Sequence, residues 1–433
     1  MTFFRLYVGS ASLLTPLKTR SCGRRFRDPV TLLLFALYGH VDSPTSWEVH
    51  CDARLALAGF EKIGAEWPSM FFHRKLRLLL SVYVDDFKMS GPTEHMDAGW
   101  RLIGERIEIE PPTPLGLYLG CVQRQIQCRL PDGTPVTCIE YDMQNFLRQC
   151  VDKYRALTGY EDEFPYAATP FLTTSEESGP ARAPANPNHH VASGATPGES
   201  GEEEEQGTVA KVAMQILMKV LYSARFACLD LLRAVQGLAR WMTKWKRQHD
   251  AELFRLICYI HHSVDRKMRG WVGNDIGETE LHLYSDADFA GCQETQKSTS
   301  GMYLGLRGSQ TSFPIAAYSK KQHCMSTSTT EAEMVAAATA LKGIGLPALL
   351  LMERLREAHD TQSPVLWFRL DNQAMIRIIR TGRNLTMRHL NRTHGVNVAW
   401  LHEQCARQGV KVEYVPSAQM VADMYTKPIT DAS

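Results

Sequence analysis

The sequence of 433 residues lacks several features that would narrow its class at once. It has no run of about 18 consecutive apolar residues, so we expect no membrane-spanning helix and no membrane partner. It carries almost no net charge, +1 at pH 7, which leaves the partner open because a balanced total hides local basic patches. A hydrophobic content of 44% and a charged content of 22% are ordinary for a globular protein.

Closely spaced cysteines are also missing. No two of the eleven cysteines lie closer than Cys121 and Cys128, so there is no CxxC pair to form a zinc site. The odd number does not suit a disulfide framework either. We therefore expect reduced, structural thiols in a reducing compartment, with an intracellular location in the cytoplasm or nucleus.

One segment has almost no large apolar side chains. Residues 173–207 are rich in Pro, Gly, Ser and Glu, and they include the solvated run Glu202–Glu205. Such a segment buries too little surface to offset its ordering entropy, which predicts a disordered linker. The expected organisation is an unassigned N-terminal segment (1–29), a first folded region (30–172), the linker (173–207), a helical connection (208–275) and a C-terminal domain (276–433).

The N-terminal segment lacks acids. Its first 27 residues hold six Lys or Arg and no Asp or Glu, a composition similar to that of mitochondrial targeting segments. The alternative, which we favour, is an arbitrary start codon upstream of a broken reading frame.

Apolar periodicity predicts the elements on either side of the linker. Before it, residues 76–92 predict two strands around a tight turn at Asp85-Asp86, and Trp47–Phe60 has helical spacing that Gly59 ends. After it come predicted helices at Val209–Arg240 and Asp250–His262, strands at 281–289, 300–308 and 311–319, a helix at Thr330–Glu357, and strands at 365–371 and 410–416. This order favours a mixed sheet flanked by helices, in a chain of mixed α+β or α/β class.

Four acids of the C-terminal domain stand at the ends of these elements. Asp286 lies late in its strand, and Asp371 directly follows another strand. Glu333 opens the long helix, and Asp423 lies in a turn before a short terminal helix. Such carboxylates can converge at one sheet edge, where two divalent cations about 3.5–4 Å apart need several of them. Because oxygen ligands without Cys or His favour Mg²⁺ or Mn²⁺, we predict one of these metals as cofactor.

The residues around each acid resemble a known family. The blocks are YSDADFAGCQETQKSTSGMYL, SKKQHCMSTSTTEAEMVAAATA, LDNQAMIRI and VEYVPSAQMVADMYTKPI. In order and spacing they resemble the ribonuclease H region of copia-type retrotransposon Pol polyproteins, over residues 281–429. The resemblance implies metal-dependent cleavage of RNA in RNA–DNA hybrids, with these catalytic and metal-binding residues: Asp286, Glu333, Asp371 and Asp423.

Each choice of acid has a near alternative. Asp288 and Glu331 each lie two residues from the chosen acid, and period-two geometry keeps Asp288 on the strand face of Asp286. His389 and His394 lie in a segment that resembles a helix of the family. For them we weigh a role in phosphate contact or product release against simple packing. Four cations are candidate phosphate contacts, with a solvated surface role as the alternative for each: Lys320, Lys321, Arg388 and Arg392.

A second resemblance covers the region before the linker and the helices after it. The carrying stretches are LLFALYGHVDSPTSWEVHCDARLALAGFEKI, YVDD, LGLYLGCVQRQ and SARFACLDLLRAVQGLARWMTKWKRQHDAELFRLICYI. They resemble the reverse transcriptase palm and the connection to ribonuclease H, which implies a palm and thumb remnant over 30–172. Asp85 and Asp86 would occupy the positions of the polymerase's catalytic pair.

Polymerase activity itself is not expected. The two metals of a polymerase need a third carboxylate, which in the family opens a DVKTAFLNG-like strand that this sequence lacks. Asp28 is the only acid before Asp42, and Pro29 after it argues against a mid-strand position. The fingers also have no counterpart, and Val41-Asp42 replaces the family's Lys-Gln. We therefore interpret Asp85 and Asp86 as vestigial.

Three hypotheses follow. The leading one is a 5′-truncated fragment of a retrotransposon reverse transcriptase and ribonuclease H, which binds RNA–DNA hybrids through backbone and 2′-hydroxyl contacts. The second, from another class, is an inert nucleic-acid-binding remnant with exposed apolar surface. The third is expression only within a longer polyprotein, with other Pol segments as partners. The sequence leaves the oligomeric state open.

Overall fold

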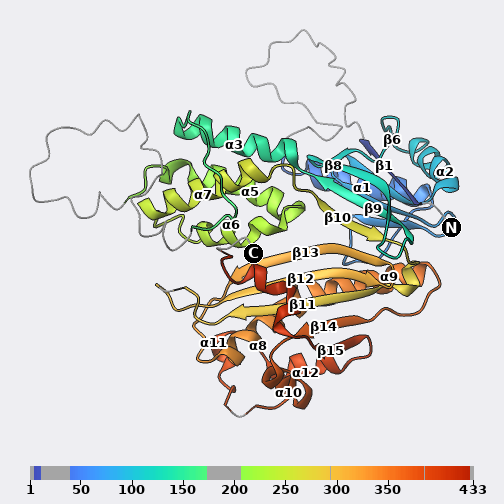
Figure 1. The fold of residues 1–433 in the computed structure, drawn as a ribbon. Helices are drawn as coiled ribbons and strands as arrows, with labels where there is room; N and C mark the ends of the chain where they lie inside the picture. Colours follow the sequence, from blue (N-terminus) through green and yellow to red (C-terminus); the bar gives the residue numbers. More distant parts are fainter. Residues whose placement is uncertain (1–3, 11–39, 173–205, 293, 385, 430–433) are drawn as a thin grey trace, which may run out of the picture. The chain divides into compact units, whose positions relative to one another are not determined.

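The computed structural model describes most of the chain and divides it into two compact units (Figure 1). The described residues are 4–10, 40–172, 206–292, 294–384 and 386–429. Unit 1 comprises Met1–Leu119 and Glu353–Gln362, and unit 2 comprises Gly120–Met352 and Ser363–Ser433. The predicted linker, apart from Gln206 and Gly207, lies outside the described residues.

Unit 1 contains a six-stranded sheet with the strand order β2-β3-β4-β5-β1-β6. The N-terminal segment, left unassigned from the sequence, supplies one of its strands: β1 pairs antiparallel with β5 from Phe4↔Pro92 to Ser10↔Asp86. The elements of this unit are β1 (Phe4–Ser10), α1 (Ser43–Leu57), β2 (Glu61–Lys62), β3 (Met70–His73), β4 (Leu78–Tyr83), β5 (Asp86–Pro92), α2 (Thr93–Gly104), β6 (Thr113–Pro114) and β7 (Leu117–Tyr118).

The predicted helix and hairpin of unit 1 are present. Trp47, Cys51 and Leu55 of α1 are buried, as their spacing predicts, and Gly59 follows the helix with a φ of 85°. The hairpin turn consists of Val84 and Asp85, one residue earlier than predicted, because Asp86 already pairs with Tyr83.

Unit 2 contains a mixed sheet with the strand order β15-β14-β11-β12-β13-β10-β9-β8. β11 runs parallel to β14, and β14 parallel to β15, whereas β11–β12 and β12–β13 are antiparallel pairs. The strands are β8 (Cys121–Arg129), β9 (Pro135–Asp142), β10 (Met268–Val272), β11 (Glu280–Asp288), β12 (Thr299–Gly308), β13 (Thr311–Lys321), β14 (Leu366–Leu370) and β15 (Val410–Tyr414). The five strands predicted after the linker are therefore confirmed, and three further strands join them.

Helices cover one face of the part of the sheet that β15, β14, β11, β12 and β13 form (Figure 1). Leu283 of β11 and Phe368 of β14 are fully buried in a core with Met334 of α8, Met375 of α10 and Leu401 of α12. The alternation of buried and half-buried residues along β11 places this apolar face opposite Tyr284. The helical elements here are α8 (Thr329–Ala340), η3 (Leu341–Gly345), α9 (Leu346–Ala358), α10 (Gln373–Thr381), α11 (Leu390–Thr393) and α12 (Val398–Ala406).

The predicted helix around His389 and His394 is interrupted. α11 ends at Thr393, Gly395 adopts a φ of 67°, and α12 begins only at Val398 after the cap Asn397. A left-handed glycine commonly ends a helix, which explains the break.

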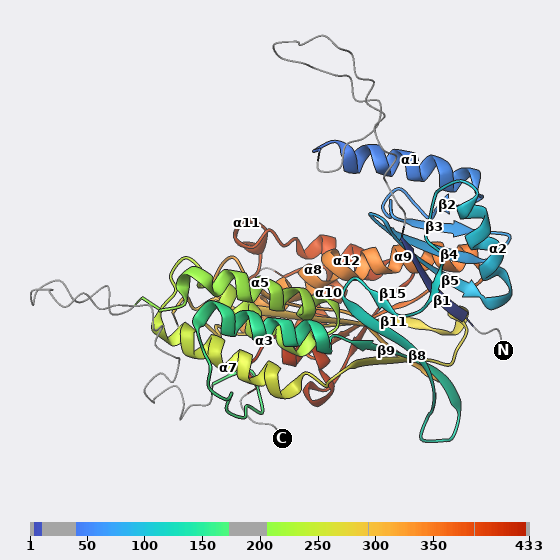
Figure 2. The same cartoon turned by 90° about the horizontal axis from the view of Figure 1, so that it is seen from above.

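A second helical layer packs around Tyr154, Val220 and Ile257. α3, α5 and α7 lie side by side in Figure 2. The predicted helix over 209–240 is two helices, because the chain turns at Ala227–Leu231 and so buries both Leu231 and Leu232. The elements of the layer are α3 (Gln144–Thr158), α5 (Ala210–Phe226), η1 (Leu229–Leu231), α6 (Leu232–Ala239) and α7 (Arg247–Ser263).

Within the described residues, the helical stretch from Thr329 to Ala358 is long and apolar enough to cross a membrane, by length and composition alone. About half of its most apolar part, 56%, is buried inside the structure, as in the core helix of a folded domain.

The predicted domain ends at residues 172, 207 and 275 are not boundaries between the two units. The reason is hydrogen bonding: β9 pairs with β10 from Met268↔Tyr141 to Val272↔Thr137, and β10 meets β13 at Trp271↔Ser312. The hairpin β8–β9, predicted as part of the first region, therefore belongs to the same sheet as the C-terminal strands.

Candidate metal centre

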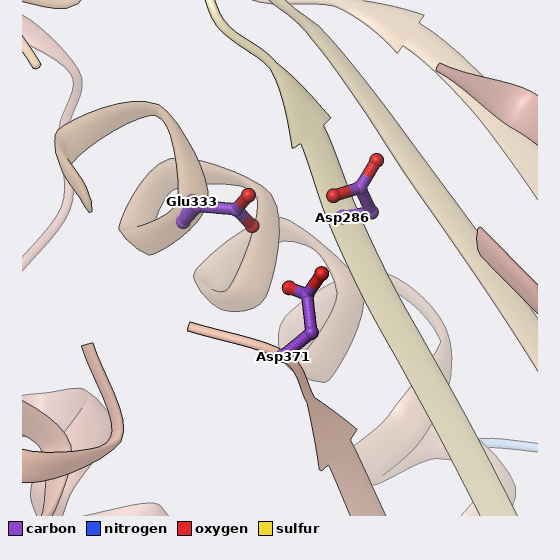
Figure 3. A group of neighbouring side chains, drawn as sticks. All are labelled: Asp286, Glu333 and Asp371. Atoms are coloured by element: carbon purple, nitrogen blue, oxygen red, sulfur yellow. The ribbon is translucent and has the colours of Figure 1, made fainter. Parts of the chain in front are cut away.

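Three of the four predicted acids converge in unit 2. Asp286, Glu333 and Asp371 each offer a carboxylate oxygen within 4.8 Å of the other two. Figure 3 shows Asp286 on its strand, Glu333 on a helix and Asp371 just beyond a strand end, with all three side chains directed toward one another. Residues 85 apart in sequence thus form one compact acidic cluster.

Strand register explains the pair of aspartates. Tyr284 of β11 lies opposite Arg369 of β14 in the parallel ladder. Asp286 and Asp371 each follow two residues later, so they project from the same face of the sheet at its carboxyl end.

Glu333 owes its position to the first turns of α8. The helix begins after Ser328, whose hydroxyl accepts the backbone N–H of Glu331. Small buried side chains, Ala287 on β11 with Ala332 and Ala336 on α8, let the helix approach the strand closely. This contact accounts for the small residues Ala332 and Ala336 on either side of the acid.

A buried glutamine fixes the loop before α8. Gln322 donates from Nε2 to Ser300 Oγ (3.1 Å) and to the carbonyl of Ala332 (2.9 Å). Its Oε1 accepts from Ser326 at 3.1 Å. Hydrogen bonds from the side-chain amide of Gln322 therefore link β12 to the helix that carries Glu333.

The cluster carries unbalanced negative charge. Burial, reinforced by Asp286 and Asp371, raises the pKa of Glu333 to about 9. Burial raises the pKa of Asp286 to about 6, although the Thr426 hydroxyl lowers it. Glu333 Oε2 is buried and receives no hydrogen bond within the described residues. A set of hard oxygen donors with an orphaned buried oxygen fits a divalent cation.

Asp423, the fourth predicted acid, stands beside the cluster rather than in it. It lies in the 3-10 helix η5 (Val421–Tyr425), not in a turn before a helix. Its Oδ1 accepts from Lys427 Nζ at 3.1 Å, and its carboxylate adds to the upward shift of the Asp286 pKa. Asp423 therefore neighbours Asp286 but lies outside the mutual 4.8 Å group.

Two hydroxyls of the C-terminal segment hold the aspartates. Thr426 Oγ1 donates to Asp286 Oδ2 at 2.7 Å, and Ser417 Oγ donates to Asp371 Oδ2 at 2.8 Å. Gly301 leaves room for this segment, since a Cβ there would lie 2.5 Å from the carbonyl oxygen of Ala422. Sequence reasoning assigned no role to these hydroxyls, although both stand in the VPSAQMVADMYTKP block.

The sequence has relatives among transposon proteins. It is 26% identical over 410 residues to the retrovirus-related Pol polyprotein from transposon RE2 of Arabidopsis thaliana, covering 93% of this chain and 24% of the relative. It is 24% identical over 404 residues to the corresponding polyprotein from transposon RE1 of the same plant, covering 91% of this chain and 24% of that relative. It is 26% identical over 232 residues to the polyprotein from transposon TNT 1-94 of Nicotiana tabacum, covering 52% of this chain and 16% of that relative. The chain is a relative of copia-type Pol polyproteins.

The chain thus spans about a quarter or less of the length of these Pol relatives. No family model matches it. Solved structures that it resembles include LC11-RNase H1 in complex with an RNA/DNA hybrid, at 13% identity and a TM-score of 0.25, covering 34% of this chain and 94% of that chain. Another is the N-terminal RNase H domain of a Mycobacterium tuberculosis protein, at 13% identity and a TM-score of 0.24, with coverages of 34% and 91%.

The two alternative acids of this chain, Asp288 and Glu331, have other partners. Asp288 is buried, and its Oδ1 accepts the backbone N–H of Thr299. Glu331 is bound by Thr327, His389 and His394. Neither acid belongs to the mutual group of three.

The four candidate phosphate contacts differ in availability. Lys320, Arg388 and Arg392 are exposed. Lys321 is half-buried, with its Nζ 3.5 Å from Cys292 Sγ and 5.8 Å from the centre of the Trp241 ring. Lys321 is therefore engaged inside the fold, which the sequence pattern did not indicate.

In unit 1, Asp85 and Asp86 lie at the β4–β5 hairpin. Burial, then the charge of Asp85, raises the pKa of Asp86. Trp47 Nε1 donates to the Val84 carbonyl at 2.6 Å, which holds the turn against α1. No third metal-ligating side chain gathers with the pair in the parts of the chain that the structure describes.

Proposed function

We propose that this chain is a fragment of a retrotransposon reverse transcriptase and ribonuclease H that cleaves the RNA strand of RNA–DNA hybrids with Mg²⁺ or Mn²⁺. The observation that carries the proposal is the convergence of Asp286, Glu333 and Asp371 in a chain related to Pol polyproteins. The parallel ladder of β11 and β14 supports it further, because it brings Asp286 and Asp371 to the same carboxyl edge of the sheet.

The three clustered carboxylates, with Asp423 beside them, would hold the cations. Bound divalent metal would supply an activated water and stabilise the leaving oxygen. The protein's own contribution is orientation: Thr426 fixes Asp286, Ser417 fixes Asp371, and burial keeps bulk water away from Glu333. Lys427 adds a positive charge beside Asp423.

The hybrid would be held mainly through its phosphates. Lys320, Arg388 and Arg392 are exposed cations in the same unit as the cluster. Contacts to backbone phosphates and 2′-hydroxyls give affinity with little sequence preference.

DNA polymerase activity is not part of the proposal. A polymerase needs a third carboxylate near Asp85 and Asp86, and none joins them within the described residues. We therefore propose that this pair is a vestige.

The test uses the full chain and a labelled RNA–DNA hybrid with Mg²⁺ or Mn²⁺. We expect cleavage of the RNA strand by the wild type and a loss on the order of 10³-fold or more in Asp371→Asn, because a metal-binding charge is removed. Asp275→Asn is the matched control, since Asp275 is exposed and makes no capping bond. Hybrid binding without cleavage by folded wild type would instead support the inert, nucleic-acid-binding remnant.

A further inference from the structure

A buried carboxylate outside the metal cluster joins two distant segments. Glu331 is 1% exposed, and its Oε1 lies 3.2 Å from the Nε2 atoms of both His389 and His394. Its Oε2 accepts the backbone N–H of Thr327 at 2.9 Å and also the Thr327 hydroxyl. We call Glu331, His389 and His394 the Glu331 junction.

The two histidines make different contacts. His389 forms a hydrogen bond with Glu331, and its side chain is 42% exposed. The His394 side chain is 1% exposed and meets the carboxylate at ion-pair distance without hydrogen-bond geometry. A third contact reinforces the junction, because Cys324 Sγ donates to the carbonyl of Thr393 at 2.8 Å.

The junction anchors a segment rich in exposed cations. Residues 386–394, the arginine segment, carry Arg388 and Arg392, both of them exposed. Neither arginine forms an ion pair within the described part of the chain. Their guanidinium groups are therefore available to an anion. The segment that carries them is held by the two histidines on Glu331, by Cys324, and by the buried side chains of Met387 and Leu390.

The same turn of α8 carries the metal cluster. Glu333 follows Glu331 by two residues, which places the two side chains about 200° apart around the helix axis. One carboxylate therefore faces the aspartates, and the other faces the arginine segment. The first turn of α8 is a rigid link between the two.

We propose that the Glu331 junction is a positioning device, which sets the arginine segment at a fixed distance from the metal cluster. The inference rests on the proposed function. Phosphates of a bound RNA–DNA hybrid contact the arginine segment, and the junction determines which part of the hybrid then reaches Glu333. Glu331, His389 and His394 are positioning residues, since they would act on the hybrid through the arginine segment that they hold.

Hybrid affinity tests the proposal without depending on cleavage. The full chain, in buffer with EDTA, is titrated against a fluorescent RNA–DNA hybrid and the Kd read by anisotropy. We expect His389→Ala/His394→Ala to raise the Kd by about tenfold, the size of one lost charge-assisted contact. The variant His389→Gln/His394→Gln, which keeps an N–H donor at each position, should restore most of the affinity. His323→Ala, at an exposed histidine of the neighbouring loop, should leave the Kd unchanged.

A double-mutant cycle separates positioning from mere stability. If the junction positions the arginines, Arg388→Ala/Arg392→Ala should weaken binding in the wild type but add little once the histidines are gone. Additive losses, or an unchanged Kd in a variant with normal thermal unfolding, would overturn the proposal. If the double alanine variant does not fold, the more exposed His389→Ala alone carries the same comparison. Wild type that binds but does not cleave overturns the proposed function while the cycle still tests the junction; wild type that does not bind overturns both.

Discussion

Glu333 combines burial, two carboxylate neighbours and an oxygen without a donor. Each of these disfavours its charged form, because a buried charge needs a partner. The Glu333 carboxylate nevertheless has an oxygen within 4.8 Å of carboxylate oxygens of Asp286 and Asp371. Stored electrostatic cost of this kind is what a divalent cation relieves on binding.

The first prediction concerns pH. The pKa of Glu333 lies at about 9 in the folded chain and near its ordinary value of 4.5 in the unfolded chain. Between these two pH values the folded chain keeps a proton on Glu333 that the unfolded chain has lost. Stability in metal-free buffer should therefore fall as pH rises from about 4.5 to about 9. In Glu333→Gln this fall should be reduced, as measured by the melting temperature in EDTA. Asp275→Asn should keep the wild-type slope; equal slopes in Glu333→Gln and wild type would contradict the prediction.

At the scale of elements, the close approach of α8 to β11 determines where Glu333 stands. Ala332 and Ala336 are fully buried against Ala287, so no larger side chain has space there. Interiors packed at this density transmit a volume change to the backbone.

Enlarging this contact should separate the acids. We expect Ala336→Leu to cost about 1–3 kcal/mol of unfolding free energy, because overpacking forces the helix outward. Cleavage should fall further than stability alone explains, since Glu333 moves with α8. Ala156→Leu on α3 is the matched control, at an exposed position. Urea unfolding and hybrid cleavage measure both effects, and full activity in a destabilised variant would refute the link.

Local patterns revealed much of the C-terminal part and less of its connections. The alternation in 281–289 and the blocks around the acids indicated both the strands and the choice of Glu333 over Glu331. Contacts between distant segments left no such trace: nothing in the sequence links Glu331 to His389 58 residues away. β8 was missed for a related reason, since its polar alternation, with buried Gln123, hides the usual apolar signal.

At the scale of the whole molecule, metal binding and folding should be coupled. A cation that binds only the folded cluster stabilises it by about 2.7 kcal/mol at a concentration one hundred times its Kd. The melting temperature of the wild type should rise with Mg²⁺ beyond the effect of NaCl at equal ionic strength. Asp371→Asn should lose this excess and Asp275→Asn should keep it. An excess that survives in Asp371→Asn would place the metal elsewhere.

Arg233 of α6 connects the helical layer to the metal cluster through Thr426. Its buried guanidinium donates from Nε to the carbonyl of Thr426 at 2.8 Å, and Thr426 in turn holds Asp286. Ala317 and Tyr425 from the C-terminal part are likewise buried in the core of that layer. The C-terminal region therefore buries part of its surface against the helical layer. A fragment that begins at residue 276 would keep the four acids but lose Arg233, and with it the hydrogen bond to the Thr426 carbonyl.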